Sequence, residues 1–399
     1  MYKLYCRLYQ FIFRIATPFL PWRKPEMLEG EGSLRRLPAR IKNQDINRIL
    51  IVTDQGIMSL GLMDNLLEAL ASEGIQYFVY DRTVPNPTID NIEEALEMYR
   101  KNQCRGIIAF GGGSPIDCAK GVAARVARPE KTIPQMKGEL KVRKKIPSLF
   151  AVPTTSGTGS EATIAAVISN SETHEKYAIN DTALIPHVAV LDPLLTVKLP
   201  PHITSTTGMD ALTHAVEAYI GRSNTKETIQ CSREAVKLIF DNLYEAYANG
   251  TNIEARTNMQ RASYLAGVAF TRAYVGYVHA IAHTLGGFYN VPHGLANAVI
   301  LPYVLEYYGE SAHKPLAELA DVAGITNSTD NIEQKATKFI EAIKKLNEDM
   351  NIPKKLSGIV ESDIPVMVER AFKEANPFYP VPKILFREDL TKLYGMIRE

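Results

Sequence analysis

The chain has 399 residues, of which 46% are hydrophobic and 22% charged, a composition that is ordinary for soluble globular proteins and a length sufficient for two domains. Its 45 basic and 44 acidic residues leave a net charge of +1, which favours a small-molecule ligand over nucleic acid or an acidic polymer. The four cysteines are scattered and form no C-x-x-C motif, which argues against a disulfide framework and favours a reducing, cytoplasmic compartment.

Residues 1–26 are predicted to form a basic amphipathic extension. Five cations precede the first acid, Glu26, and apolar residues recur at helical spacing: Lys3, Arg7, Arg14, Arg23 and Lys24, with Leu4, Leu8, Phe11 and Ile15. Because Arg14 interrupts the apolar run, the segment does not resemble a secretory signal, and it is too short to span a bilayer. We expect a helix that packs on its own domain or on a partner subunit, with attachment to a membrane surface as the less favoured alternative.

Residues 27–199 alternate between strand and helix patterns. The run at 48–54 is apolar and β-branched, which is typical of a strand buried on both faces. Further strands are expected at 77–80, 106–110, 148–152 and 188–191, with a helix at 91–102. This alternation predicts a doubly wound α/β domain with a mostly parallel sheet, in which nucleotides bind at the carboxyl ends of the strands.

A glycine-rich turn at 111–117 directly follows one of these strands. Its candidate cofactor-binding residues are Gly112, Gly113, Ser114 and Asp117. The glycines let a phosphate approach the backbone, and Ser114 can cap the helix that follows. Asp117 serves either the ligand or the cap. Because the motif is neither a Walker loop nor G-x-G-x-x-G, a purely structural turn is an equal alternative.

A second polar turn, at 153–161, follows the strand expected at 148–152. Its hydroxyl groups suit a ribose, a pyrophosphate or a nicotinamide amide, with a plain polar loop as the alternative. The candidate residues here are Thr154, Thr155 and Thr158. Asp54, at the end of the first strand, can accept the hydroxyls of an adenosine ribose and repel a 2′-phosphate, which favours NAD over NADP. A simple turn residue is the alternative for Asp54.

Residues 200–399 show long helical patterns, which predict an all-helical domain. Asp210 and His214 are four residues apart on an expected amphipathic helix, so both side chains can reach one point. His279 and His293 come from a second stretch, in which two glycines interrupt the helix before His293 begins its own turn or helix. One carboxylate and three imidazoles predict a site for a single divalent transition metal with an open catalytic position.

These segments, in this order, resemble the iron-containing, group III alcohol dehydrogenases. The resemblance covers nearly everything after residue 45 and is carried by Asp54 and by residues 85–87, 111–117, 153–161, 208–214, 279–283 and 292–294. It implies a dehydroquinate-synthase-like fold, NAD(P) at the two turns, and Fe²⁺ or Zn²⁺ on Asp210, His214, His279 and His293. Asn86 and Lys176 are similar to cofactor contacts of the family. A homodimer is implied by the family alone, and short members lack the extension, so no role is carried over for it.

The resemblance further implies hydride transfer between NAD and a small aliphatic primary alcohol or diol, with the metal acting as a Lewis acid on the bound alcohol. His283, one helical turn after His279, is the candidate for proton relay or substrate orientation, with support of the metal ligands as its alternative role. Two other functions stay open. One is a lyase resembling dehydroquinate synthase, although the apolar segment at 280–286 does not suit an acidic substrate. The other is a non-catalytic NAD- and metal-binding sensor, which would have no reason to retain all four metal ligands together with His283.

Overall fold

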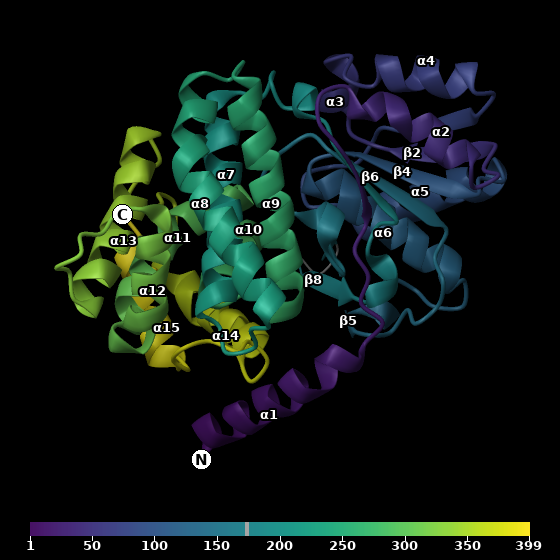
Figure 1. The fold of residues 1–399 in the computed structure, drawn as a ribbon. Coiled ribbons are helices and arrows are strands. Elements are labelled where there is room, and N and C mark those ends of the chain that lie inside the picture. Colours follow the sequence, from purple (N-terminus) through teal and green to yellow (C-terminus); the bar gives the residue numbers. More distant parts are fainter. Residues whose placement is uncertain (172–174) are drawn as a thin grey trace. The chain divides into compact units, whose positions relative to one another are not determined.

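The computed structural model describes residues 1–171 and 175–399. By its internal contacts the chain divides into two compact units, one formed by Pro21–Lys198 and the other by Met1–Leu20 together with Leu199–Glu399. The first unit is α/β and the second is helical (Figure 1), so the predicted fold class is confirmed. The finer division at residues 26 and 199 remains a prediction.

The α/β unit contains a six-stranded sheet in the order β1-β9-β6-β4-β2-β3, in which every pair of neighbours is parallel. Its strands are β1 (Glu26–Glu29), β2 (Arg48–Val52), β3 (Gln76–Tyr80), β4 (Gly106–Gly111), β6 (Ser148–Pro153) and β9 (Val188–Leu191). The strand order reverses between β2 and β4. Ligands of doubly wound sheets bind at such a reversal, beyond the carboxyl ends of the strands. Asp54, which follows β2, and the turn at 111–117, which follows β4, both lie at this reversal.

Helices cover both faces of this sheet (Figure 1). They are α2 (Leu37–Lys42), α3 (Gln55–Ser59), α4 (Asp64–Ser72), α5 (Ile89–Lys101) and α6 (Gly113–Ala127), with short 3₁₀ turns η2 (Ser33–Arg36), η3 (Pro134–Met136), η4 (Ser160–Ala162), η5 (Thr182–Leu184) and η6 (Pro193–Leu195). Successive side chains of β2 enter different cores: Leu50 and Val52 pack with residues of α5 and α6, whereas Ile49 and Ile51 pack with those of α2 and α4. Burial on both faces explains why the strands are continuous apolar runs.

A second, three-stranded sheet was not predicted. It contains β5 (Gly138–Glu139), β7 (Ala165–Asn170) and β8 (Glu175–Asn180) in the order β5-β8-β7, with β7 and β8 antiparallel. Its strands mix buried and partly exposed positions, so they lack the apolar runs that identify the main sheet. The edge strand β1 was missed because it is only four residues long and has one fully buried residue.

The helical unit consists of long helices connected by short turns. They are α1 (Tyr2–Ala16), η1 (Thr17–Phe19), α7 (Pro201–Ile220), α8 (Lys226–Ala248), α9 (Ile253–Ala273), α10 (Tyr277–Tyr289), α11 (His293–Tyr308), α12 (Glu310–Ala323), α13 (Ile332–Asp349), η7 (Glu361–Asp363), α14 (Ile364–Ala375) and α15 (Arg387–Ile397). Every residue of α7 from 208 to 220 is buried, because α8, α9, α11 and α12 all contact this helix. The expectation of an amphipathic helix for Asp210 and His214 is therefore wrong, since α7 runs through the interior.

Helix α1 packs on the helical unit through one of its faces. The Arg7 guanidinium donates to the carbonyls of Val381 and Pro382 at 2.7 and 2.8 Å, and the Gln10 amide donates to that of Tyr379 at 2.7 Å. Phe13 makes an edge-to-face contact with Phe378. Among the residues that the structure describes, no helix is long and apolar enough to cross a membrane.

Candidate functional site

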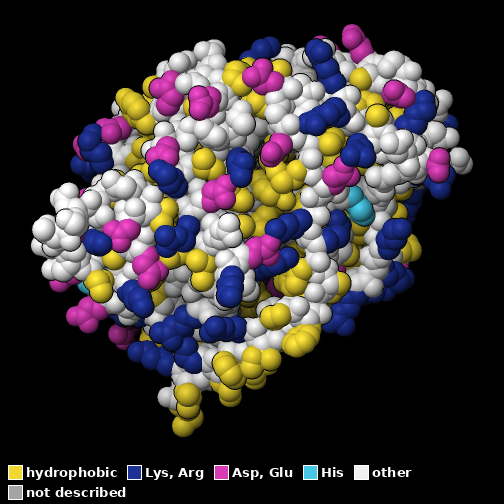
Figure 2. Space-filling view, in the orientation of Figure 1, with side chains coloured by type: hydrophobic (Ala, Val, Ile, Leu, Met, Phe, Trp, Pro, Cys, Tyr) yellow, Lys and Arg dark blue, Asp and Glu magenta, His cyan; other side chains and the backbone are white. Residues whose placement is uncertain are grey.

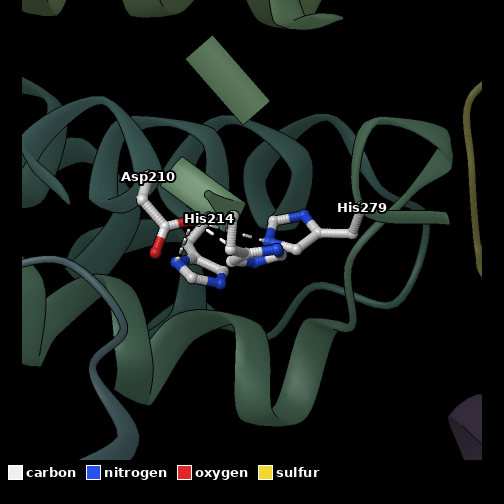
Figure 3. Close-up of side chains that lie close together, drawn as sticks. Asp210, His214 and His279 are labelled. Carbon is white, nitrogen blue, oxygen red and sulfur yellow. Dashed lines mark ion pairs between the residues drawn. The ribbon is translucent and has the colours of Figure 1, made fainter. Parts of the chain in front are cut away.

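Three helices bring the four predicted metal ligands together. Asp210 and His214 lie one turn apart on α7, His279 lies on α10, and His293 is the first residue of α11. One donor atom from each lies within 4.8 Å of the donor atoms of the other three, and Figure 3 shows Asp210, His214 and His279 pointing toward one another. The expected interruption at the two glycines is wrong, because α10 continues past them to Tyr289, whereas His293 does begin a following helix.

The spacing and chemistry of this group fit one divalent transition metal. The Oδ1 atom of Asp210 lies 3.6 Å from His293 Nε2, 3.9 Å from His214 Nδ1 and 4.0 Å from His279 Nε2. Two donors that bind one ion at about 2.1 Å cannot be more than about 4.2 Å apart, so these separations are already in range. A set of three imidazoles and one carboxylate suits iron or zinc.

Glu217 orients one of the imidazoles, and the sequence prediction missed it. Its Oε2 accepts a hydrogen bond from His279 Nδ1–H at 2.6 Å, and its Oε1 accepts one from the Val278 N–H at 2.8 Å. The first bond keeps the imidazole proton of His279 on Nδ1, so the unprotonated Nε2 faces the cluster and is the atom that can bind a metal. A Cβ atom on Gly276 would lie 2.6 Å from Glu217 Oε1, so only glycine permits this approach. The sequence places residues 210, 214 and 217 on one helical face, but it does not show that Glu217 is buried.

Asn297 is a second residue that the sequence prediction missed. It is fully buried and lies one turn after His293 on α11. Its amide nitrogen donates to Asp210 Oδ1 at 2.7 Å and lies 3.2 Å from Nε2 of both His279 and His293. One amide thus contacts three of the four candidate ligands, which holds the Asp210 carboxylate in place beside the imidazoles.

His283 lies beside the cluster without belonging to it. Its ring stacks on that of His293, with centroids 5.3 Å apart and an interplanar angle of 14°. Its Nδ1 lies 2.7 Å from Glu374 Oε1, which also accepts a hydrogen bond from the Tyr379 hydroxyl at 2.8 Å. Glu374 therefore fixes the orientation of the imidazole. Neither Glu374 nor Tyr379 was predicted, because they are distant in sequence from the histidines.

In the α/β unit, the two predicted cofactor turns lie side by side. Gly111 pairs with Pro153 across β4 and β6, and the Thr154 N–H donates to the Gly111 carbonyl at 3.0 Å. A Cβ atom on Gly113 would lie 2.8 Å from Cγ2 of Thr158, so glycine is needed where the turns meet. On Gly112 such an atom would be 3.5 Å from Thr155, which is an ordinary contact.

Asn86, Ser114 and Lys176 also come together. The Asn86 N–H donates to Ser114 Oγ at 3.3 Å, and Lys176 Nζ donates to Asn86 Oδ1 at 2.8 Å. The expectation that Ser114 caps the next helix is wrong: α6 begins at Gly113, and its N-cap Gly112 supplies no side-chain hydrogen bond. The start of α6 therefore offers backbone N–H groups that suit a phosphate.

Asp117 makes contacts that support a structural role. Its Oδ1 accepts a hydrogen bond from the Ser160 hydroxyl at 2.7 Å, and its Oδ2 accepts one from the Val167 N–H at 3.2 Å. Burial raises the pKa of this carboxyl, and the Lys120 ammonium opposes that effect. Lys120 is itself fully buried and donates to the carbonyls of Ser160 and Thr163 at 2.7 and 3.0 Å. Together Asp117 and Lys120 fix the second turn against α6.

Asp54 is the N-cap of α3. Its Oδ1 accepts a hydrogen bond from the Ile57 N–H at 2.9 Å, which agrees with the alternative prediction of a turn residue. No hydrogen bond to Oδ2 is seen among the residues that the structure describes, and the side chain is half-exposed. The same carboxylate can therefore cap α3 and accept a hydrogen bond from a ligand.

Comparisons with known proteins agree with this fold and site. A family model described as "Iron-containing alcohol dehydrogenase" matches residues 25–193, and one described as "Fe-containing alcohol dehydrogenase family, C-terminal" matches residues 204–397. The chain is 42% identical to the 1,3-propanediol dehydrogenase of Klebsiella pneumoniae, over 83% of this chain and 86% of that protein. It is 34% identical to the NAD-dependent methanol dehydrogenase of Bacillus methanolicus, over 89% and 93%.

A solved structure of a 1,3-propanediol oxidoreductase superposes with a TM-score of 0.91 and is 36% identical, over 94% of this chain and 99% of that one. The two family models together span both units of the structure, and the two relatives each match more than four-fifths of the chain. The chain belongs to the iron-containing alcohol dehydrogenase family.

Proposed function

We propose that the protein is an NAD-linked, metal-dependent dehydrogenase that interconverts small aliphatic primary alcohols or diols with the corresponding aldehydes. The observation that carries the proposal is the meeting of Asp210, His214, His279 and His293 from three helices in a chain of this family. Relatives named for propanediol and methanol support a small alcohol as substrate. The comparisons give no support to the lyase or to the sensor.

We assign the metal to Asp210, His214, His279 and His293, with iron preferred and zinc as the alternative. A bound divalent metal supplies a Lewis acid that makes an alcohol hydroxyl acidic near neutral pH. The protein's part is to hold the donors in place before the substrate arrives. Glu217 keeps His279 in one tautomer, and Asn297 keeps the Asp210 carboxylate beside the imidazoles.

NAD is assigned to the adjoining turns of the α/β unit. The uncapped start of α6 suits the pyrophosphate, and Oδ2 of Asp54 suits a ribose hydroxyl. The other proposed contacts are Asn86, Gly112, Gly113, Ser114, Thr154, Thr155, Thr158 and Lys176. Asp117 acts on NAD through the shape of the turns, since both its oxygens accept hydrogen bonds from the protein. The relative named as NAD-dependent supports this choice of cofactor.

His283 is proposed as the group that orients the substrate or exchanges a proton with it. Its Nδ1 is engaged by Glu374, so Nε2 is the nitrogen that can exchange a proton with the hydroxyl of the alcohol. Its ring stacks on His293, which keeps that nitrogen close to the candidate metal ligands. We further propose that the protein is cytoplasmic, because its four cysteines form no disulfide bond among the described residues, and that it is a homodimer, as the resemblance to the family implies.

The test is NADH absorbance with purified, metal-stripped protein, to which ferrous iron or zinc is added anaerobically with NAD and a panel of short alcohols and diols. We expect turnover that depends on the metal and disappears in an Asp210→Ala/His214→Ala variant. Metal and NAD binding are measured on the same samples by calorimetry. If both bind and no alcohol gives NADH with either metal, the dehydrogenase proposal is wrong, and the lyase and the sensor return as the candidates.

A further inference from the structure

Helix α1 leaves a long apolar stripe exposed on the side opposite its packed face. Half of the 18 large hydrophobic side chains exposed in the described residues lie between positions 1 and 19. Those that are more than half exposed and line the stripe are Leu4, Tyr5, Leu8, Phe11, Ile12 and Ile15, and Phe19 follows in η1. Figure 2, in the orientation of Figure 1, shows hydrophobic side chains gathered along the lower edge where α1 lies. A contiguous exposed stripe of this kind marks an interaction surface.

The stripe belongs to an ordered helix, not to a loose tail. On the packed face Cys6 is fully buried and Gln10 nearly so, and Arg7 and Gln10 together donate hydrogen bonds to four carbonyl oxygens of residues 377–382. Tyr9 and Phe13 both make edge-to-face contacts with Phe378, with ring centroids 6.4 and 5.4 Å apart. These contacts fix the rotation of α1, so the apolar side chains cannot turn inward.

Charge decides which partner fits the stripe. The first 25 residues contain no aspartate or glutamate, and Lys3, Arg7 and Arg14 share one flank of the stripe at helical spacing. Arg7 is used in packing, whereas Lys3 and Arg14 are exposed. A second copy of the chain docked stripe to stripe would bring cations to cations, which is unfavourable. An apolar row of Leu, Ile and Phe bordered by cations is the pattern of helices that lie in the surface of an anionic membrane.

We propose that α1 attaches the protein to an anionic lipid surface. Leu8, Phe11, Ile12 and Ile15 enter the boundary between head groups and acyl chains, and Lys3 and Arg14 contact the lipid phosphates and carboxylates. The helix lies along the surface and does not span the bilayer. This surface association is separate from the metal and from NAD, and it does not require turnover.

The test is co-sedimentation of the full-length protein with vesicles of phosphatidylcholine alone and with vesicles that also contain phosphatidylserine. We expect binding to the second kind only, and binding that weakens as salt is raised. Leu8→Glu/Ile12→Glu should weaken binding by at least about 100-fold, because two side chains lose their transfer into lipid. Lys3→Gln/Arg14→Gln should weaken it by about 30-fold, or about fivefold per charge.

The matched control is Ile332→Glu/Val360→Glu, which places two acids at aliphatic positions that are equally exposed, at 55% and 50%, but lie outside the stripe. It should bind vesicles as the wild type does. The proposal is overturned if the wild type fails to sediment with phosphatidylserine vesicles, or if both α1 variants bind as well as it does. It is also overturned if analytical ultracentrifugation without lipid shows that Leu8→Glu/Ile12→Glu alone halves the mass, because the stripe would then be covered by a second copy.

Discussion

Replacing Glu217 by glutamine tests whether a group that contacts no metal nevertheless controls metal binding. Glu217 accepts hydrogen bonds from His279 Nδ1–H at 2.6 Å and from the Val278 N–H at 2.8 Å, and it is almost fully buried. Glutamine has nearly the same shape but only one acceptor oxygen. If that oxygen stays on Val278, an NH₂ group faces Nδ1 of His279 and moves the imidazole proton to Nε2, the atom that points into the cluster.

If the glutamine instead turns its oxygen to His279, its NH₂ group meets the Val278 N–H, and a buried donor is left without an acceptor. In the first orientation both hydrogen bonds persist but the metal-binding nitrogen of His279 carries the proton, whereas in the second orientation one hydrogen bond is lost. Loss of such an orienting contact typically lowers metal affinity by 10- to 100-fold, or about 1.4–2.7 kcal/mol. In the second orientation the metal-free protein should also lose about 1–3 kcal/mol of unfolding free energy, the usual cost of one buried unsatisfied group.

The assay is competition between the protein and a chromophoric chelator for Zn²⁺ and, anaerobically, for Fe²⁺, with urea unfolding of the metal-free protein alongside. Glu318→Gln is the matched control, since Glu318 accepts a hydrogen bond from the Tyr219 hydroxyl at 2.7 Å and its amide oxygen can still do so. It should bind metal as the wild type does. Wild-type metal affinity in Glu217→Gln, with the protein folded, would falsify the assignment of Glu217 as the residue that orients His279.

Three further outcomes are expected from the α/β unit. Gly113→Ala should raise the dissociation constant for NAD by about tenfold or more, measured by calorimetry, because the new methyl displaces Thr158; metal affinity should not change. Asp54→Asn should keep the cap and the melting temperature but reduce the preference for NAD over NADP about fivefold in steady-state kinetics, since about 1 kcal/mol of repulsion is lost; an unchanged ratio would count against the ribose contact. Burial and nearby cations lower the pKa of the His187 imidazole to about 4, and its Nδ1 accepts a hydrogen bond from the Leu149 N–H. Between pH 6.5 and 4, His187 therefore binds a proton in the unfolded chain but not in the folded protein. The free energy of unfolding should therefore fall as the pH drops from 6.5 toward 4, by about 1–2 kcal/mol at pH 5. Urea unfolding at pH 7 and pH 5 should show a smaller fall for His187→Asn than for the wild type.

Elements buried from both sides were the easiest to predict from the sequence. Strands β2, β4 and β6 lie between two helical layers, so their residues are apolar without interruption and only a sheet core explains them. The small sheet of β5, β7 and β8 has no such pattern, because β7 and β8 mix buried and partly exposed positions over six residues and β5 has only two residues. Burial on one face leaves too weak a signal in so short a segment.

Within the site, the candidate metal ligands could be predicted from the sequence, whereas the residues that orient them could not. The i, i+4 pair Asp210 and His214 is visible in the sequence because both members are chemically distinctive metal ligands. Glu217 and Asn297 lie on the same helices at helical spacing, yet a glutamate or an asparagine on a helix is most often solvated. Only packing reveals that they are buried. The prediction for Ser114 was wrong for a related reason: a serine at the start of a helix commonly caps it, but here Asn86 uses its hydroxyl.

The contacts of the candidate metal site run between helices, which explains why its geometry depends on packing. Glu217 on α7 orients His279 on α10, and Asn297 on α11 holds Asp210 on α7, so α7 and α11 each fix a ligand that another helix carries. This arrangement needs α11 very close to α7. A Cβ atom on Gly294, next to His293, would lie 2.4 Å from a backbone oxygen of α7, so glycine at that position sets the separation of the helices. Helix packing and metal affinity are therefore coupled in this fold, because Asp210 and His279 are each positioned by a residue of another helix.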